Sequence, residues 1–157
     1  MINKLHSIVS LKESIKKQKK LGSIIGFTNG CFDLLHQGHV SLIKNAREMC
    51  DYLIVGLNSD NSVKLLKGAN RPIDNEKIRI KNLANVKEVD AIIVFPNATP
   101  LELIAELNPN ILIKGSDYKS KLVVGANIIA KNGGRVEYVP ILKGFSTTKI
   151  INNKLIN

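Results

Sequence analysis

The sequence of 157 residues contains only two cysteines, Cys31 and Cys50, and no tryptophan. Two cysteines without metal-ligand spacing argue against a disulfide scaffold and a zinc knuckle, and they favour a reducing compartment. The chain also lacks any apolar run near the roughly 20 residues that span a bilayer, and its first residues form no apolar signal-peptide core. We therefore expect a cytoplasmic protein that does not associate with membranes.

Aromatic residues make up 4% of the chain and are scattered along it, which argues against a surface for stacking nucleic-acid bases. Lysine and arginine together number 23, against 13 acidic residues, and give a formal net charge of +10. Only four of these cations are arginines, although proteins that recognise nucleic acids usually rely on bidentate arginine contacts. The charge therefore indicates an anionic ligand without identifying it.

The hydrophobic fraction of 44% is large enough for the core of one domain. Residues 6–20 have apolar side chains at helical spacing and lysines mainly on the other side, which predicts an amphipathic helix with a solvated basic face. Near-continuous apolar runs then alternate with helical patterns, which predicts an α/β fold with a doubly wound sheet of about five parallel strands and helices on both faces. Strands are expected over residues 24–28, 52–57, 91–95, 111–113 and 135–139, and further helices over 38–50, 75–85, 100–107, 121–131 and 147–156.

Polar residues gather after several of the predicted strands, where the carboxyl ends of a doubly wound sheet meet. Such sheets bind ligands at this edge, near the point at which the strand order reverses. The sequence therefore predicts a binding site that several loops build together. Its first candidates are Asn29, Gly30 and Asp33 after the first strand, Asn58 and Asp60 after the second, Lys114 and Asp117 after the fourth, and Ser146 to Thr148 after the fifth.

The segment from Thr28 to His39 carries the strongest chemical signal. It follows the first strand and opens the next helix, where backbone amides and the helix dipole attract anions. His36 and His39 lie three residues apart, so their rings fall on one side of a helical turn, and Gly38 lets a phosphate approach the backbone. Metal binding with Asp33, packing in the core and general acid–base catalysis are the competing interpretations. Phosphate binding is favoured, because phosphoryl transfer depends on positioning and charge stabilisation.

His36-Gln37-Gly38-His39, after Gly30-Cys31-Phe32-Asp33, resembles the HxGH signature of the nucleotidyltransferase superfamily. The longer block from Phe27 to Val40 is similar to the adenylyltransferases that act on heptose 1-phosphate in bacteria. An HxGH motif alone is weak, but further blocks follow in the family's order and cover almost the whole chain. These blocks are Asn58-Ser59-Asp60, Leu66-Lys67-Gly68, Arg71-Pro72-Ile73 with Arg79, Lys114 to Tyr118, Asn132-Gly133-Gly134 and Gly144 to Thr148.

The resemblance implies a single nucleotidyltransferase domain over residues 1–157, with an N-terminal helix over 1–22 and a Rossmann-like core over 23–157. His36, His39 and Lys67 would be catalytic, since they would contact the triphosphate and stabilise charge on the α-phosphorus. The acceptor would be bound by Asp33, Asn58, Asp60 and Arg71. The nucleotide and its phosphates would be bound by Thr28, Asn29, Gly30, Cys31, Phe32, Gly38, Arg79, Lys114, Gly115, Asp117, Ser146, Thr147 and Thr148.

Ordinary structural roles compete with these assignments at several positions. Lys67, on a predicted glycine-containing loop, competes with a surface lysine of a lysine-rich chain. Arg79 lies in a predicted helix, where an exposed position is the alternative to phosphate binding. Ser146 to Thr148 would also serve as the N-cap of the last helix. Asp33 would orient either the histidines or a sugar hydroxyl, and Cys31 fits a small packed residue better than a reactive thiol.

The resemblance implies that the phosphate of a sugar 1-phosphate attacks the α-phosphorus of ATP in line and expels pyrophosphate. The expected acceptor is D-glycero-β-D-manno-heptose 1-phosphate, and the expected product is ADP-heptose. Mg²⁺ would bridge the phosphates of ATP, held by the nucleotide and water with no metal site on the protein. A separate sugar kinase would supply the acceptor, because 157 residues leave no room for a kinase. The family also implies a homodimer.

Two other functions stay open from the sequence. One is a cytidylyltransferase acting on glycerol 3-phosphate or a related alcohol phosphate. Gly30-Cys31-Phe32-Asp33 and Leu142-Lys143-Gly144 depart from the pattern of those enzymes and favour the heptose branch. The other, more distant, function is a non-enzymatic nucleic-acid-binding protein, which the basic N-terminal helix supports.

Overall fold

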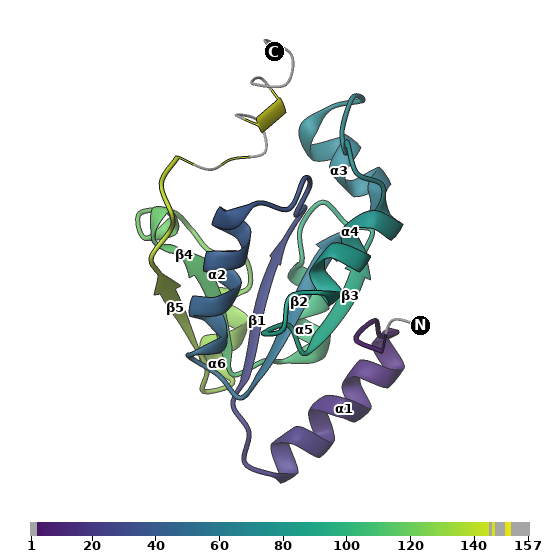
Figure 1. Cartoon of the computed structure of the whole chain (residues 1–157). Helices are drawn as coiled ribbons and strands as arrows, with labels where there is room; N and C mark the ends of the chain where they lie inside the picture. The colour runs from purple at the N-terminus through teal and green to yellow at the C-terminus, as the bar shows by residue number, and fades with distance from the viewer. Residues whose placement is uncertain (1–2, 145, 147–149, 152–157) are drawn as a thin grey trace.

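A five-stranded, all-parallel sheet forms the centre of the computed structural model, which describes residues 3–144, 146 and 150–151 (Figure 1). The strand order is β3-β2-β1-β4-β5. The predicted doubly wound α/β fold is therefore confirmed. The strands are β1 (Ile25–Gly30), β2 (Tyr52–Asn58), β3 (Ala91–Phe95), β4 (Ile111–Gly115) and β5 (Arg135–Val139).

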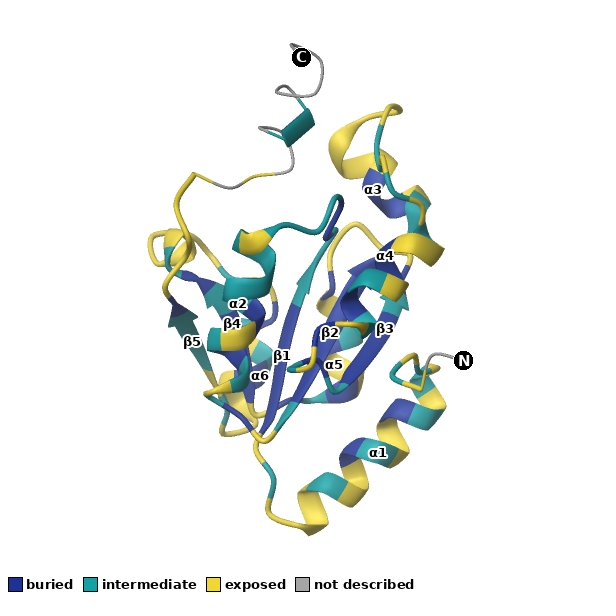
Figure 2. Ribbon diagram, viewed as in Figure 1, coloured by how far each residue is buried: buried dark blue, intermediate teal, exposed yellow. Residues whose placement is uncertain are grey.

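Helices cover both faces of this sheet and create two apolar cores. The helices are α1 (Ile8–Lys20), α2 (Gln37–Arg47), α3 (Asp60–Lys67), α4 (Glu76–Ala84), α5 (Leu101–Leu107) and α6 (Ala126–Lys131), with a short 3₁₀ helix at Ser116–Tyr118. Helices α2 and α4 pack on one face, whereas α1, α5 and α6 pack on the other. The strands between these layers are mostly buried (Figure 2).

Strands β2, β3 and β4 are largely apolar runs because each supplies side chains to both cores. Along β2, Leu53 and Val55 pack beneath α2 and α4, while Ile54 packs in the opposite core. This alternation follows from the period of two in an extended strand. A strand buried on both faces therefore shows no polar alternation in its sequence.

The strand order reverses between β1 and β4, which is the switch point of the sheet. Pairing between these strands is confined to Gly26 with Ile111 and Phe27 with Leu112. Farther along, the carboxyl ends of β1 and β4 are no longer paired with each other. The crevice that opens there carries the candidate site.

One helix was not expected from the sequence, and it changes the position of Lys67. The polar segment after β2 forms α3, in which Ser59 accepts a hydrogen bond from the backbone of Ser62 as the N-cap. Only Ser62 and Val63 of this helix are buried, so its apolar pattern is too short to predict it. Lys67 therefore ends a helix, rather than lying in the predicted loop. Most of the last predicted helix, 147–156, lies outside the described residues.

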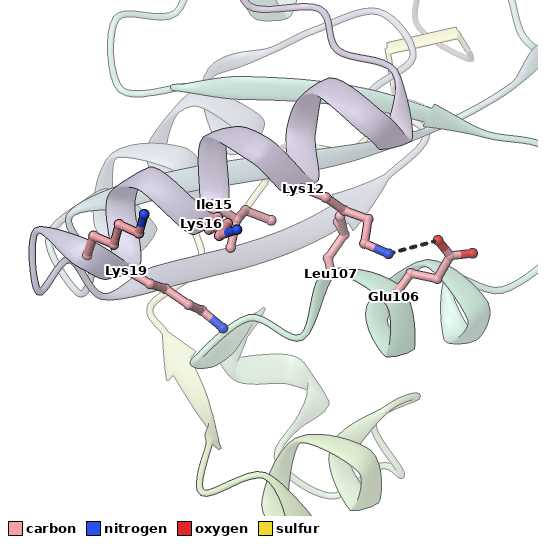
Figure 3. Close-up of a pocket in the computed structure, with 7 residues that line it drawn as sticks. Lys12, Ile15, Lys16, Lys19, Glu106 and Leu107 are labelled. Carbon is pink, nitrogen blue, oxygen red and sulfur yellow. Dashed lines mark ion pairs between the residues drawn. The ribbon is translucent and has the colours of Figure 1, made fainter.

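The basic N-terminal helix lies against α5, and its C-terminal half lies toward the amino ends of the strands. Lys12 pairs with Glu106 at 4.0 Å (Figure 3). Lys19 Nζ donates to the carbonyl of Asn108 at 3.0 Å. Asn108 shortly precedes β4, so the contact of Lys19 with Asn108 lies toward the amino ends of the strands. The α1 lysines are therefore remote from the crevice at the switch point. No helix in the described part of the chain is long and apolar enough to cross a membrane.

Candidate active site

A cavity of about 380 Å³ lies at the carboxyl ends of the strands, beside the switch point. The N-terminus of α2, the end of α3, the loop before α4, the end of β4 and the segment after β5 all contribute to its wall. The structure thus brings together residues that are far apart in the sequence. The predicted site residues that line it are His36, Gly38, His39, Lys67, Arg71, Gly115, Asp117 and Ser146.

His36 and His39 hold each other in a reciprocal cap at the start of α2. The backbone N–H of His39 donates to Nδ1 of His36, and that of His36 donates to Nδ1 of His39, both at 3.3 Å. The two rings stack with centroids 3.7 Å apart and planes 16° from parallel. Because each Nδ1 accepts a backbone proton, each neutral ring carries its own proton on Nε2. The pair therefore carries two Nε2–H groups.

The environment keeps these imidazoles uncharged. Burial lowers the pKa of His39 to about 3, with smaller contributions from His36 and Lys67 that Asp33 opposes. Burial also lowers the pKa of His36. A ring with so low a pKa is a poor proton acceptor at neutral pH, but it still donates its N–H. The competing interpretation of a general acid–base pair is therefore disfavoured by the site itself.

The neutral state of His39 leads to a pH prediction. We expect the ring nitrogens of His39 to show a neutral Nε2–H tautomer in NMR spectra from about pH 8 down to about pH 5. The unfolded chain binds this proton near pH 6.5 and the folded chain only near pH 3, so unfolding becomes easier as pH falls between these values. Urea denaturation of the His39→Ala variant should show a weaker loss of stability in that range. A His39 ring that becomes charged near pH 6.5 would contradict this assignment.

Lys114 bridges the separated ends of β1 and β4. Its Nζ donates to Oδ1 of Asn29 at 2.9 Å and lies 5.2 Å from the centre of the Tyr118 ring. Burial lowers the pKa of Lys114, while Asp117 acts in the opposite direction. A Cβ at Gly115 would lie 2.6 Å from the Asp117 carboxylate, so any other residue here would force the side chains of Asp117 and Ile141 to move. Asn29 and Lys114, predicted at the ends of two different strands, therefore meet at the switch point.

Several residues predicted to bind the nucleotide are buried or packed within the protein, and Phe32 among them contacts a histidine. Thr28 is 1% exposed, and the Phe32 ring packs edge-on against His39 with centroids 5.3 Å apart. Gly30 allows the close approach of Phe32, whose ring would lie 3.1 Å from a Cβ there. Burial raises the pKa of the Cys31 thiol in spite of nearby cations, which disfavours the reactive thiolate. Thr28 and Phe32 are both buried, and nucleotide contacts at these two positions stay a prediction.

Arg79 is the largest correction, because its side chain is fully buried and already occupied. Its guanidinium donates to the carbonyls of Cys31, Asn58 and Asp74 at 2.7–3.0 Å. It also pairs with Oδ1 of Asp60 at 2.8 Å. A guanidinium with no exposed surface cannot bind an ATP phosphate, so Arg79 joins three loops instead.

Most of the residues predicted to bind the acceptor are also engaged in contacts within the protein, and one lines the cavity. Asn58 is 3% exposed, and its Nδ2 donates to Oγ of Ser62. Asp60 is held by Arg79, and the carboxylate of Asp33 is fully buried. Asn58 and Asp33 therefore already hold other groups of the protein, and acceptor binding at these positions stays a prediction. Of the predicted acceptor residues, only Arg71 lines the cavity.

Residues that were not predicted to belong to the site also line the cavity. Tyr118 ends the sequence block Lys114 to Tyr118, which resembles the family, so the sequence could have indicated this residue. Ile141 and Leu142 follow β5 and contribute apolar side chains. No chemical pattern singles them out, because only the fold brings that segment over α2. Thr147 and Thr148 lie outside the described residues, while the neighbouring Ser146 reaches the cavity.

Protein ligands for a metal ion are few at this site. The cavity wall has one carboxylate, Asp117, whereas Mg²⁺ prefers several oxygen ligands in an octahedral arrangement. No group of three or more His, Cys, Asp or Glu residues within the described ranges is arranged to hold a metal ion. The donor set therefore fits a metal that enters with a phosphate ligand better than a resident ion.

The chain resembles curated proteins over most of its length. Two relatives named bifunctional protein HldE are 52% identical over 87% of this chain in Hyphomonas neptunium and 51% identical over 89% in Rhodospirillum rubrum. The chain spans only 28% of the length of either relative. The similarity therefore concerns one part of those proteins.

Solved structures and a family model agree with this similarity. A lipopolysaccharide core biosynthesis protein from Thermoplasma volcanium has a TM-score of 0.61 and 28% identity, covering 79% of this chain and 100% of its own. Pantothenate synthetase from Thermus thermophilus shares the fold, with a TM-score of 0.58 and 17% sequence identity. The match covers 94% of this chain and 70% of that protein. The family model described as cytidylyltransferase-like matches residues 27–153. The chain therefore belongs to the cytidylyltransferase-like family, and it is a nucleotidyltransferase.

Proposed function

We propose that this nucleotidyltransferase transfers AMP from ATP to D-glycero-β-D-manno-heptose 1-phosphate, forming ADP-heptose and pyrophosphate. The observation that carries the proposal is the uncharged pair of His36 and His39, which lines one cavity with Lys67 and Arg71. Two N–H donors and two cations suit a reaction between a triphosphate and a phosphate. No covalent enzyme intermediate is required.

The low pKa of His39 favours a phosphate as the nucleophile. A phosphate monoester is already ionised at neutral pH and attacks the α-phosphorus without losing a proton to the enzyme. An alcohol nucleophile would need a base, and a ring with a pKa of about 3 is a weak one. His36 and His39 therefore act by donating hydrogen bonds to phosphoryl oxygens as negative charge builds up in the transition state.

Lys67 and Arg71 add positive charge to the same cavity. In the proposed reaction Lys67 binds the triphosphate, Arg71 binds the acceptor, and the segment at Ser146 holds the leaving pyrophosphate. Mg²⁺ enters as part of the MgATP substrate, coordinated by phosphate oxygens and water. It neutralises phosphate charge when bound, and the protein side chains orient the two substrates for in-line attack.

The choice of adenine and heptose rests on similarity. The ordered sequence blocks resemble heptose 1-phosphate adenylyltransferases, and one structural neighbour is named as a lipopolysaccharide core biosynthesis protein. The reaction requires an earlier step that places a phosphate on the anomeric carbon of the sugar. We propose that a separate sugar kinase performs this step, and that the enzyme acts as a homodimer in the cytoplasm.

Pyrophosphate release tests the proposed substrates directly. The protein should be incubated with ATP or CTP, Mg²⁺ and one acceptor at a time: D-glycero-β-D-manno-heptose 1-phosphate, glucose 1-phosphate or glycerol 3-phosphate. We expect the fastest release with ATP and the heptose phosphate. Release only with CTP and glycerol 3-phosphate would identify the cytidylyltransferase instead. No turnover, together with salt-dependent binding of nucleic acid, would identify the non-enzymatic alternative.

A further inference from the structure

Asp33 occupies an unusual stretch of backbone between β1 and α2. Its neighbours Phe32 and Leu34 have φ angles of 48° and 50°, in the left-handed region that side chains with a Cβ rarely adopt. Strain of this kind persists only where surrounding contacts enforce it, and it gathers at functional sites. The loop is therefore held in a conformation that its sequence alone does not favour.

The carboxylate of Asp33 provides contacts of the required kind. It accepts hydrogen bonds from the backbone N–H groups of Ile73 and Asp74 at 2.8 and 2.9 Å, and from Nε of Arg71 at 3.0 Å. Burial acts to raise the pKa of Asp33, but these hydrogen bonds outweigh it and keep the pKa below its usual value. A fully buried, ionised carboxylate thus fastens the loop before α4 to the loop that carries the histidines.

Arg71 is anchored through one nitrogen only. Its Nε is held by Asp33, and its side chain is 13% exposed where it lines the cavity. In the part of the chain that the structure describes, no hydrogen bond engages its two terminal nitrogens. Arg79 differs, because its guanidinium also donates to three backbone carbonyls and has no exposed surface. Of these two arginines, only Arg71 is both fixed and available to a ligand.

We propose that Asp33 is a positioning residue that aims Arg71, so that the terminal nitrogens of Arg71 bind the phosphate of the acceptor as a bidentate fork. The ligand class is a phosphate monoester. The inference rests on the proposed function for the identity of the sugar, but not for the phosphate. Asp33 acts through Arg71 and does not touch the substrate.

Separate binding measurements test this inference. Isothermal titration of the wild-type protein, Asp33→Asn and Arg71→Gln should give the dissociation constants of ATP and of the heptose phosphate independently. We expect both variants to weaken acceptor binding about 10- to 100-fold, the range for hydrogen bonds to charged groups. ATP binding should stay unchanged within error. Equal weakening of both ligands, or unchanged acceptor binding, would overturn the proposal.

The double variant distinguishes positioning from a merely structural role. If Asp33 acts through Arg71, Asp33→Asn combined with Arg71→Gln binds the acceptor no worse than Arg71→Gln alone. If the double variant instead multiplies the increases in the dissociation constant of the two single variants, Asp33 acts independently of Arg71. The difference should also appear in KM for the acceptor rather than in KM for ATP.

Asp90 provides a matched control at the opposite end of the sheet. Its Oδ2 accepts from the backbone of Leu53 at 2.8 Å and pairs with Arg47 at 3.0 Å, so it also joins an arginine to a backbone amide. Asp90→Asn should lower the free energy of unfolding while leaving both dissociation constants unchanged. Weaker acceptor binding in this control would show that general loss of stability explains the Asp33 result.

Two further measurements keep the inference testable. If Asp33→Asn fails to fold, Arg71→Lys replaces it, since lysine keeps the charge but has neither Nε nor a planar fork. If Arg71→Lys binds the acceptor with wild-type affinity, the proposal that Asp33 aims the guanidinium of Arg71 at the phosphate is overturned. If the wild-type enzyme does not turn over the heptose phosphate, inorganic phosphate serves as the probe. Weaker phosphate binding in the Asp33 and Arg71 variants would then support the fork, and unchanged binding would overturn it.

Discussion

Replacement of His39 by alanine is expected to lower kcat about 100- to 1000-fold, the usual effect of removing one preorganised donor to a charged transition state. The ring lines the cavity beside His36 and presents a neutral N–H, so its loss removes a hydrogen bond that strengthens as charge develops. KM for ATP should change less than kcat, because the ground state carries less charge at the reacting oxygens. Steady-state pyrophosphate release measures both constants.

The result depends on a variant that folds normally. His39→Ala also removes the Nδ1 acceptor for the backbone of His36, so a loss of about 1 kcal/mol in helix stability is expected. Circular dichroism should therefore show the wild-type spectrum with a slightly earlier urea midpoint. His6→Ala is the matched control, because His6 lies outside the cavity and contacts Ser10. Full activity in a folded His39→Ala variant would refute the proposed role of the pair.

The sequence predicts the fold well, because the apolar runs of β2, β3 and β4 form a strong pattern. Strands β3 and β5 have the predicted bounds, and the predicted alternation of strands and helices is confirmed. Helix α3 escapes prediction because only one turn of it, at Ser62 and Val63, is buried. Its remaining residues are polar or exposed, so their sequence resembles that of a loop.

The site is less predictable, since residue type does not reveal the partner. The HxGH block places both histidines at the cavity because the motif fixes its own local geometry. Arg79 has the side chain of a phosphate-binding residue, yet the backbone carbonyls of Cys31, Asn58 and Asp74 occupy it. Asp33 likewise faces the backbone of Ile73 and Asp74, which only the fold brings within reach. Tertiary contacts therefore decide which polar residues remain available to a ligand.

The structure also shows where some of the cations behind the formal net charge of +10 lie. The α1 lysines are exposed beside α5, toward the amino ends of the strands, whereas Lys67 and Arg71 line the cavity. Lys114 adds a third cation at the switch point, held by Asn29. A small share of the positive charge thus serves the proposed phosphate site, and that share cannot be separated from the total in the sequence.

Replacement of Arg79 by methionine should produce a large loss of stability. Methionine fills much of the buried volume but leaves the carbonyls of Cys31, Asn58 and Asp74 without their donor. Unsatisfied buried groups and a broken ion pair together should cost about 3 to 5 kcal/mol of the free energy of unfolding. Such a loss is a large fraction of the roughly 5–15 kcal/mol that stabilises a typical domain. Urea denaturation followed by circular dichroism measures it.

Two companion variants separate the contributions to this effect. Asp60→Asn removes only the ion pair, and because the Asp60 side chain is 37% exposed we expect a cost below about 1 kcal/mol. Arg79→Lys keeps a charge but cannot reach all four acceptors, so its stability should lie between those of Asp60→Asn and Arg79→Met. ATP affinity of the folded Arg79→Lys protein then decides between the two roles of this arginine. Wild-type stability with weakened ATP binding would restore Arg79 to the phosphate site, whereas reduced stability with unchanged ATP binding fits a residue that joins the loops beneath it.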